Sequence, residues 1–303
     1  MNKISNHHAG LLIAIIGAVL FSTKSIIAKL LYKEGIDATT LIALRMLLAT
    51  PFFIFMYFYA AKGKPKIVSK EYLQIFGLGF IGYYLSSYLD FLGLETISAG
   101  LERLILFLTP SFVLIFSEIV YKRKASKQQW LSMLFAYVGI AFVFWNDLHF
   151  AKDGNVVPII IGAGFVLGAA VSYASYLLFS EGLLKKVGTL RLVSLAMLAS
   201  SVFAVGQFLL LRGGTTLFIQ KDAVWLLSLY NAIVCTVFPV TLTMLAISKI
   251  GSSITAQAGM LGPVSTLFIA FWILGEPITL IQLVGTTCVL VGMMILANKP
   301  KNT

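Results

Sequence analysis

The chain contains two copies of one hydrophobic segment, and this repeat limits the possible folds more than any other feature. Residues 97–139 align with residues 250–292 without a gap when Leu108–Pro110 is placed over Leu261–Pro263. The same alignment pairs Ile97 with Ile250, Leu92 with Leu245, Gln129 with Gln282, and Gly139 with Gly292. The copies are offset by an odd number of hydrophobic spans, and successive spans cross a bilayer in alternating directions. The second copy is therefore predicted to be inverted relative to the first, with a pocket at the membrane midplane between them.

The composition is that of an integral membrane protein. Hydrophobic residues make up 59% of the 303 residues and charged residues only 12%, and the mean hydropathy of +0.93 excludes an ordinary soluble domain. A helix needs about 20 mostly apolar residues to cross a bilayer. Ten segments meet this requirement: 10–31, 38–60, 72–94, 98–121, 127–146, 157–183, 189–211, 223–247, 251–274 and 279–297. We expect an all-α membrane protein of ten transmembrane helices, arranged as two inverted five-helix repeats in residues 1–150 and 151–303.

The net charge of +11 is a signal of orientation. When the connections are taken alternately, one set holds most of the basic residues: Lys3, Lys62, Lys64, Lys66, Lys70, Lys122, Arg123, Lys124, Lys127, Lys185, Lys186, Arg191, Lys249, Lys299 and Lys301. The other set holds four basic residues mixed with acidic ones. Basic residues in short connections stay on the cytoplasmic side, so both termini are predicted to be cytoplasmic, in a cell inner membrane. No basic stripe carries interleaved aromatics outside the spans, so nucleic acid is not an expected partner.

The residues show no pattern of an enzyme, a metal site or a cofactor site. Cys235 and Cys288 fall inside predicted spans, where free thiols behave as small apolar residues. His7, His8 and His149 lack the spacing of metal ligands. There is no zinc motif, P-loop, nucleophile elbow or pair of carboxylates at catalytic spacing. We therefore expect no catalytic residues, no metal and no cofactor. The first span is longer than the core of a signal peptide and is expected to be retained.

Two groups of residues resemble the EamA branch of the drug/metabolite transporter (DMT) superfamily. Residues 17–29 with residues 44–49 are similar to the first helix and the arginine-containing second helix of that family. Residues 261–285, with the run Gly275-Glu276-Pro277, resemble the ending of its repeat. The resemblance covers residues 10–297 and implies alternating-access transport of a small metabolite, often an amino acid or derivative and often outward. Arg123 in the first copy aligns with Glu276 in the second. The two positions are predicted to lie on opposite sides of the membrane, and the preference for basic residues on the cytoplasmic side explains the difference.

Other functions stay open at this stage. A carrier of phosphorylated or nucleotide-linked metabolites is favoured by Lys24, Arg45 and Arg103, whereas a receptor, scaffold or enzyme would show no solute flux. The expected partners are a small-molecule substrate and the lipid bilayer. Asp90 and Glu102 are candidates for proton coupling, with facilitated diffusion as the alternative, and the residues leave the oligomeric state open.

Ionisable residues within the spans are the main candidates for a site, because a charge at the bilayer centre costs about 3 kcal/mol and rarely faces lipid. A short connection brings Asp90 close to Glu102 and Arg103 on the next span. These three residues are predicted either to bind a substrate headgroup or a proton, or to form an ion-pair network that holds the helices together. Arg45 is predicted to be a structural tether to a neighbouring acid or helix end.

Lys24 lies near the midplane of the first span and is expected to face a hydrated cavity. The alternative is a buried ion pair with Asp90 or Glu118. An ammonium group in a cavity would favour substrates that carry a carboxylate or a phosphate.

Uncharged polar residues complete the predicted substrate site. Tyr83 and Ser87 share a helical face with Asp90. The second half offers Ser172, Tyr176, Asn231 and Gln257, for which hydrogen bonding between helices is the alternative role. Pro110 and Pro263, at matched repeat positions, are predicted to bend their helices and to act as hinges.

Overall fold

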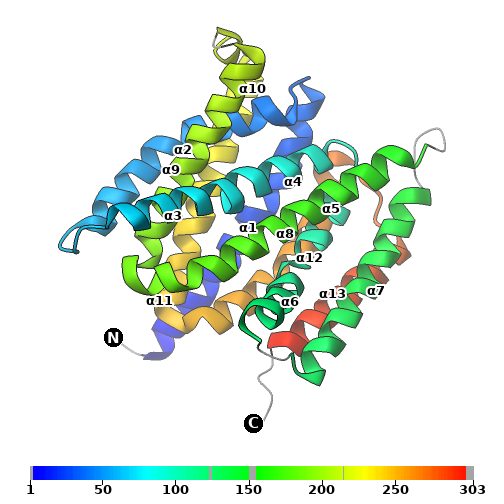
Figure 1. The fold of residues 1–303 in the computed structure, drawn as a ribbon. Helices are drawn as coiled ribbons and strands as arrows, with labels where there is room; N and C mark the ends of the chain where they lie inside the picture. Colours follow the sequence, from blue (N-terminus) through cyan, green and yellow to red (C-terminus); the bar gives the residue numbers. More distant parts are fainter. Residues whose placement is uncertain (1–2, 123–124, 150–154, 214, 298–303) are drawn as a thin grey trace.

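The computed structural model describes residues 3–122, 125–149, 155–213 and 215–297, and these residues form a bundle of helices (Figure 1). Eight described segments are long and apolar enough to cross a membrane, and two shorter apolar helical segments, Leu261–Leu274 and Leu280–Ile295, bring the described total to ten. The ten predicted spans coincide with these segments. The prediction of an all-helical membrane fold is confirmed.

The segments from α1 to α7 precede residue 150 and those from α8 to α13 follow it; we call these groups the first and second halves. The first half consists of α1 (Lys3–Lys33), α2 (Ala38–Ala61), α3 (Ser69–Gly79), η1 (Phe80–Leu85), α4 (Ser86–Leu94), α5 (Ala99–Leu106), α6 (Thr109–Tyr121) and α7 (Lys127–His149). The second half consists of α8 (Val157–Val187), α9 (Thr189–Arg212), η3 (Thr215–Leu217), α10 (Asp222–Ala232), η4 (Ile233–Val237), α11 (Phe238–Gly259), α12 (Leu261–Ile269), η5 (Ala270–Leu274) and α13 (Leu280–Ala297).

The third span of each half contains a π-helical turn at the same repeat position. In the first half η1 separates α3 from α4 and begins at Phe80, and in the second half η4 separates α10 from α11 and begins at Ile233. The alignment that places Leu108 over Leu261 also places Phe80 over Ile233. A π-turn inserts an extra residue into the backbone ladder and frees backbone carbonyls, and such turns are frequent at functional sites.

The fourth span is broken at matched positions in the two halves. Phe107 and Leu108 separate α5 from α6. In the second half, the third span ends at Gly251, a non-helical residue within α11 with a φ of +81°, and Met260 separates the last part of α11 from α12. Pro110 lies in the first turn of α6 and Pro263 is the third residue of α12. A proline is tolerated there because the first N–H groups of a helix have no intrahelical partner. Each span is thus interrupted next to its proline, in line with the predicted bend, and the role of the two prolines as hinges stays a prediction.

The fifth spans, α7 and α13, start with the same reciprocal cap. The Ser126 N–H donates to Gln129 Oε1 over 2.7 Å while the Gln129 N–H donates to Ser126 Oγ over 3.2 Å. The same arrangement is found at the start of α13. There the Thr279 N–H donates to Gln282 Oε1 over 3.3 Å, and the Gln282 N–H donates to Thr279 Oγ1 over 3.2 Å. This is a capping box, which satisfies two of the free donors at a helix start.

Contacts across the molecule show that the halves exchange equivalent surfaces. A methyl group placed on Gly139 of α7 would lie 2.4 Å from the carbonyl oxygen of Gly285 in α13, and one on Gly292 would lie 2.7 Å from the carbonyl oxygen of Ser132. Ser132 and Gly285 occupy matched positions in the repeat. The contact is thus of the kind that a two-fold axis produces, in which each partner uses the same patch.

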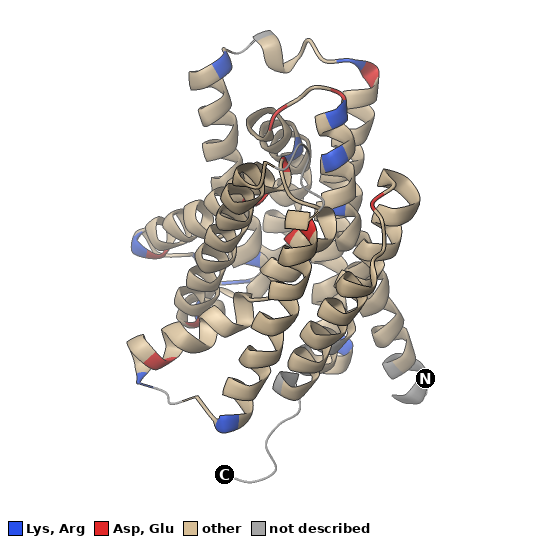
Figure 2. Ribbon diagram, turned by 90° about the vertical axis from the view of Figure 1, so that its right-hand side faces the viewer, with Lys and Arg blue, Asp and Glu red and all other residues tan. Residues whose placement is uncertain are grey.

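Alternate connections lie on opposite sides of the bundle. In Figure 1 the start of α1, the α2–α3 connection and the α8–α9 connection lie toward the lower left, whereas the α1–α2, α9–α10 and α12–α13 connections lie toward the upper right. We call the first side the basic face, because it carries the lysine-rich connections, and the second the acidic face. The long tan stretches in Figure 2 show how little charge the helices carry between these faces.

Candidate functional site

A cluster of buried charges lies between α1, α4 and α5. Lys24 Nζ in α1 is 2.5 Å from Asp90 Oδ2 in α4 and 3.7 Å from Glu102 Oε1 in α5. The side chains of these residues are exposed by only 6%, 3% and 0%. Arg103 follows Glu102 on α5, and its Nη2 donates to the Ser22 hydroxyl of α1 over 3.4 Å. We call Lys24, Asp90, Glu102 and Arg103 the charge cluster.

The structure gives Lys24 the buried ion pair that the sequence left as the alternative to an open cavity. Lys24 is 5% exposed and its ammonium group touches Asp90. Glu118 is in α6 and takes no part in the ion pairs of the described residues. The expectation that Lys24 faces a hydrated cavity is wrong for this conformation, because Asp90 on α4 packs directly against α1.

Several polar atoms of the charge cluster have no hydrogen-bond partner in the part of the chain that the structure describes. These are Asp90 Oδ1, both carboxylate oxygens of Glu102, and Arg103 Nε. Buried polar atoms in folded proteins are nearly always paired, because each unpaired atom costs about 1–3 kcal/mol. The charge cluster thus contains both hydrogen-bond acceptors and a hydrogen-bond donor that are unsatisfied. This combination is typical of a site that binds a polar ligand.

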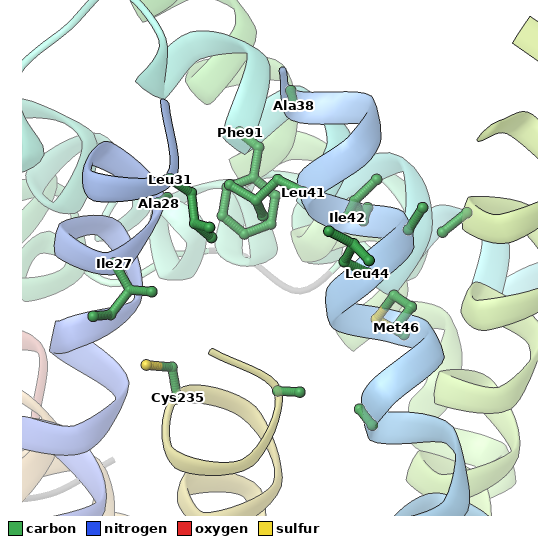
Figure 3. Packing of buried hydrophobic residues seen from close by; sticks show 14 of the residues in the cluster. Ile27, Ala28, Leu31, Ala38, Leu41, Ile42, Leu44, Met46, Phe91 and Cys235 are labelled. Atoms are coloured by element: carbon green, nitrogen blue, oxygen red, sulfur yellow. The ribbon is translucent and has the colours of Figure 1, made fainter. Parts of the chain in front are cut away.

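Aromatic rings cover the charges. Lys24 Nζ lies 5.4 Å from the ring centres of both Phe21 and Phe91, and the Arg103 guanidinium carbon lies 4.5 Å from the Phe21 ring. Cations are stabilised over aromatic faces at these distances. Phe91 is fully buried and packs beside Leu31 and Leu41 (Figure 3).

Arg45 in α2 reaches across to the second half. Its Nε donates to Thr236 Oγ1 in the π-turn η4 over 2.8 Å, and the Thr236 hydroxyl donates to the Asn231 carbonyl at the end of α10 over 2.9 Å. Arg45 forms no ion pair within the described residues, so it is a tether between halves and not to an acid. Its Nη1 and both side-chain polar atoms of Asn231 are buried and have no partner among the described residues. Since the Arg45 guanidinium also lies 5.4 Å from the Phe91 ring, Phe91 connects this group to Lys24.

Three predicted residues meet at the other π-turn. The Ser172 hydroxyl donates to the Ile81 carbonyl of η1 over 2.7 Å, and the hydroxyls of Tyr83 and Tyr176 are 3.4 Å apart. The Tyr176 ring packs on Gly82, where an added methyl group would lie 2.3 Å from it. Ser172 and Tyr176 therefore connect α8 to η1, and the charge cluster is formed without them.

Two further predicted residues are not brought into these groups by the described contacts. Ser87 is half-buried, and its neighbour Ser86 makes the hydrogen bond to α8, with the Ala169 carbonyl as acceptor over 3.0 Å. Gln257 lies in α11, and its side chain is outside the described part of the structure.

Four residues that shape the site were not among the predicted site residues: Ser22, Phe91, Thr236 and Gly262. The Ser22 hydroxyl donates to the Gly262 carbonyl over 3.1 Å, and a methyl group on Gly262 would lie 3.3 Å from Arg103 Nη2. Thr236 could have been found, because the repeat places it at the position of Tyr83. For Phe91 the sequence holds no signal beyond its place inside a span, whereas Gly262 belongs to the segment 261–285 that resembles the repeat ending of the family.

Contacts between segments close the acidic face. Asp37 forms an ion pair with Arg212, and Glu34 Oε2 lies 3.3 Å from Lys221 Nζ, so the α1–α2 connection is joined to the segment between α9 and α10. Glu276 accepts the Ala99 N–H over 3.2 Å and thereby joins the α12–α13 connection to the start of α5. We call these three contacts the acidic-face closure.

Two carboxyl groups of this closure have shifted pKa values. Burial would raise the pKa of Asp37, but hydrogen bonds from Thr40 and the Arg212 guanidinium outweigh this effect and hold the pKa below its usual value. For Glu276 burial dominates and raises the pKa, although the Ala99 N–H acts in the opposite direction.

The basic face carries two hollows. A cavity of about 610 Å³ lies there among the end of α2, the α8–α9 connection and α11. A second hollow of about 480 Å³ lies between α3 and α8 and is lined mainly by apolar side chains.

Comparisons with known proteins agree with this architecture. The profile of the EamA-like transporter family matches residues 8–145 and again residues 160–298. The uncharacterized transporter YcbK of Bacillus subtilis is 32% identical over 295 residues, which cover 94% of this chain and 91% of that protein. The UDP-galactose translocator 1 of Caenorhabditis elegans is 25% identical over 155 residues, 47% of this chain and 43% of that one. A solved crystal structure with 14% identity covers 95% of this chain and 96% of its own with a TM-score of 0.63, a likeness of fold.

Both halves of the chain therefore match one family, and a full-length relative is a transporter. These matches exclude the receptor, scaffold and enzyme alternatives and confirm the resemblance read from residues 17–49 and 261–285. The protein is a multi-pass membrane transporter, and it belongs to the EamA-like transporter family of the DMT superfamily.

Proposed function

We propose that this protein is an inner-membrane secondary transporter that moves a zwitterionic metabolite, an amino acid or a derivative, outward by alternating access. The charge cluster together with Arg45 and Asn231 would hold the substrate. The observation that carries the proposal is the set of unpartnered donors and acceptors described above.

A zwitterion fits the chemistry of these atoms. An ammonium group needs acceptors, and Asp90 Oδ1 with the Glu102 carboxylate supplies them. A carboxylate needs donors, and Arg45 Nη1 with Arg103 Nε supplies those. Ionised partners make the strong hydrogen bonds in a dry site, so both ends of an amino acid would gain by leaving water together.

The state of the two faces supports alternating access. The acidic-face closure joins connections from both halves, whereas the basic face has a large cavity. By the rule that basic connections stay in the cytoplasm, the open side is proposed to be the inner one and both termini to be cytoplasmic. The rocking units are proposed to be residues 1–150 and 151–303, with the helix breaks at Pro110 and Pro263 as hinges.

A second candidate is a carrier of phosphorylated or nucleotide-linked metabolites. Lys24, Arg45 and Arg103 outnumber Asp90 and Glu102 by one, so the group as a whole favours a substrate with net negative charge. The relative whose name specifies UDP-galactose adds weight to this candidate.

Counterflow in proteoliposomes tests the proposal and separates the two candidates. The purified full chain is reconstituted with an internal mixture of unlabelled amino acids or of sugar phosphates, and uptake of the labelled compounds is followed. We expect uptake with amino acids only, and loss of it in Asp90→Asn and Arg103→Gln, while Lys70→Gln on the basic face serves as the matched control. Uptake driven by phosphate esters alone would favour the second candidate and overturn the first.

Coupling to protons is part of the same proposal. Asp90 and Glu102 are the carboxylates of the charge cluster, and facilitated diffusion is the alternative. An inward proton gradient should accelerate export of the labelled substrate from vesicles in the wild type and not in Glu102→Gln. A rate that is independent of the gradient in both proteins would establish facilitated diffusion.

A further inference from the structure

The cavity on the basic face has the features of an anion site, separate from the charge cluster. Its walls come from the C-terminal end of α2, the start of α9 and the middle of α11. Lys62, Lys64 and Arg191 line it together with the hydroxyl-bearing residues Thr189 and Ser248. The lining includes no aspartate or glutamate, so its positive charge has no neutralising carboxylate in the cavity wall.

Arg191 supplies a buried donor without a partner. Arg191 is only 5% exposed, although it carries a full charge. Its Nη1 donates to the Pro65 carbonyl over 3.0 Å, which fixes the guanidinium at the cavity, while its Nε is buried with no hydrogen-bond partner in the described ranges. A fixed guanidinium with a free edge is suited to an oxyanion, which accepts two parallel hydrogen bonds from it.

The start of α9 contributes a second, independent set of donors. Gly188 is the N-cap of this 24-residue helix, and it has no side chain that could accept from the first N–H groups. Those groups and the helix dipole favour an anion at this point. Gly188 has a φ of +86°, a conformation that side chains rarely adopt, so the chain keeps glycine there at the expense of a cap.

Lys64 completes the arrangement from the opposite side. A methyl group on Gly188 would lie 3.6 Å from Lys64 Nζ, which places the ammonium beside the uncapped helix start. Neither Lys62 nor Lys64 takes part in the ion pairs of the described residues. Guanidinium, ammonium and backbone N–H groups thus approach one volume from three directions.

We propose that this cavity binds a phosphate group. A tetrahedral phosphate carries up to two charges and can accept from all three sets of donors at once, whereas a planar carboxylate can face only two of them. The phosphate can belong to a soluble ion or ester, or to the headgroup of an anionic lipid, since Tyr59, Met244 and Ile247 add an apolar wall. This inference stands on the basic face alone and does not depend on the substrate proposed above.

Binding of defined phosphates to the purified full chain tests the inference. Titration calorimetry in detergent would measure inorganic phosphate against chloride at constant ionic strength, and dihexanoyl phosphatidic acid against dihexanoyl phosphatidylcholine. Lys64→Gln removes the exposed ammonium. Thr189→Asp places a carboxylate in the first turn of α9, where it stabilises the helix and competes with the ligand. Lys70→Gln is the control, because Lys70 is on the same face but outside the cavity wall.

We expect saturable binding to the wild type and the control, with affinity about tenfold lower in Lys64→Gln and lower still in Thr189→Asp. Equal affinity for inorganic phosphate and phosphatidic acid would identify a soluble source, and tighter binding of phosphatidic acid would identify a lipid headgroup. The proposal is overturned if neither ligand binds the wild type saturably, or if both variants bind as tightly as the wild type.

Discussion

Replacing one or both members of the Lys24–Asp90 pair separates its contribution to folding from its contribution to transport. Lys24 Nζ touches Asp90 and is 3.7 Å from Glu102, and all of these groups are buried. Lys24→Met alone leaves two carboxylates without their cation, and Asp90→Leu alone leaves the ammonium beside Glu102 only. Lys24→Met combined with Asp90→Leu removes the pair and fills its volume with apolar atoms.

The expected magnitudes follow from the burial of the pair. Removing one partner of a buried ion pair costs about 3–5 kcal/mol, because the remaining charge is left uncompensated, whereas replacing both by apolar residues of similar size is often neutral. We therefore expect each single variant to lose about 3–5 kcal/mol of stability, and the double variant to recover more than half of that loss. Glu102 keeps the double variant below the wild type, because its distant cation is gone.

Unfolding of the purified variants and flux in proteoliposomes are the two measurements. Flux is normalised to the amount of folded protein, so that poor folding is not mistaken for lost function. If the pair binds substrate, the double variant folds but transports at about 1% of the wild-type rate or less, which corresponds to about 2.7 kcal/mol of lost stabilisation. Wild-type flux in the double variant would assign the pair to structure alone. Wild-type stability of Lys24→Met would contradict the buried pair itself.

Three further changes test other parts of the structure. Gly139→Ala places a methyl group 2.4 Å from a carbonyl oxygen of α13 and should cost about 1–3 kcal/mol in unfolding experiments, whereas Gly164→Ala, with open space around it, should be neutral or stabilising by up to about 1 kcal/mol. Equal effects would contradict the close α7–α13 crossing. Asp37→Asn, which breaks the pair with Arg212, should increase labelling of cysteines introduced on the acidic-face side of the site, and unchanged labelling would argue against the closure. Burial raises the pKa of Glu276 in the folded protein, so its ionisation opposes folding as the pH rises through that value. The wild type should therefore gain stability relative to Glu276→Gln as the pH falls through the folded pKa toward about 4.3, the unfolded pKa, and a constant difference would refute this.

The membrane fold could be predicted from the sequence because its determinants are local. A span is set by a run of about 20 apolar residues, and the repeat is visible as matched residues such as Gln129 and Gln282. These two glutamines form capping boxes with Ser126 and Thr279. The caps can also be predicted from the sequence, since they require only the S/T-x-x-Q spacing.

The site could be predicted only in part, because its geometry depends on how helices rotate against each other. The sequence identified every member of the charge cluster, but whether Lys24 meets Asp90 or open space depends on the contact of α1 with α4. The π-turns carry no residue signature, and they shift the register of the helix by one residue. Thr236, which accepts from Arg45, and Ile81, whose carbonyl accepts from Ser172, both lie in these turns.

The repeat explains the scaffold, and departures from the repeat mark the site. The π-turns η1 and η4, the helix breaks, the capping boxes and the glycine crossings are matched between the halves. Asp90, Glu102 and Arg103, by contrast, correspond to Thr243, Thr255 and Ala256 in the second half. Structural devices can be duplicated at no electrostatic cost, whereas a second set of charges beside the first would leave like charges close together in a medium where each is already costly. One shared pocket needs only one such set, so a duplicated transporter is expected to keep its buried charges on one half and its neutral hydrogen-bonding groups on the other.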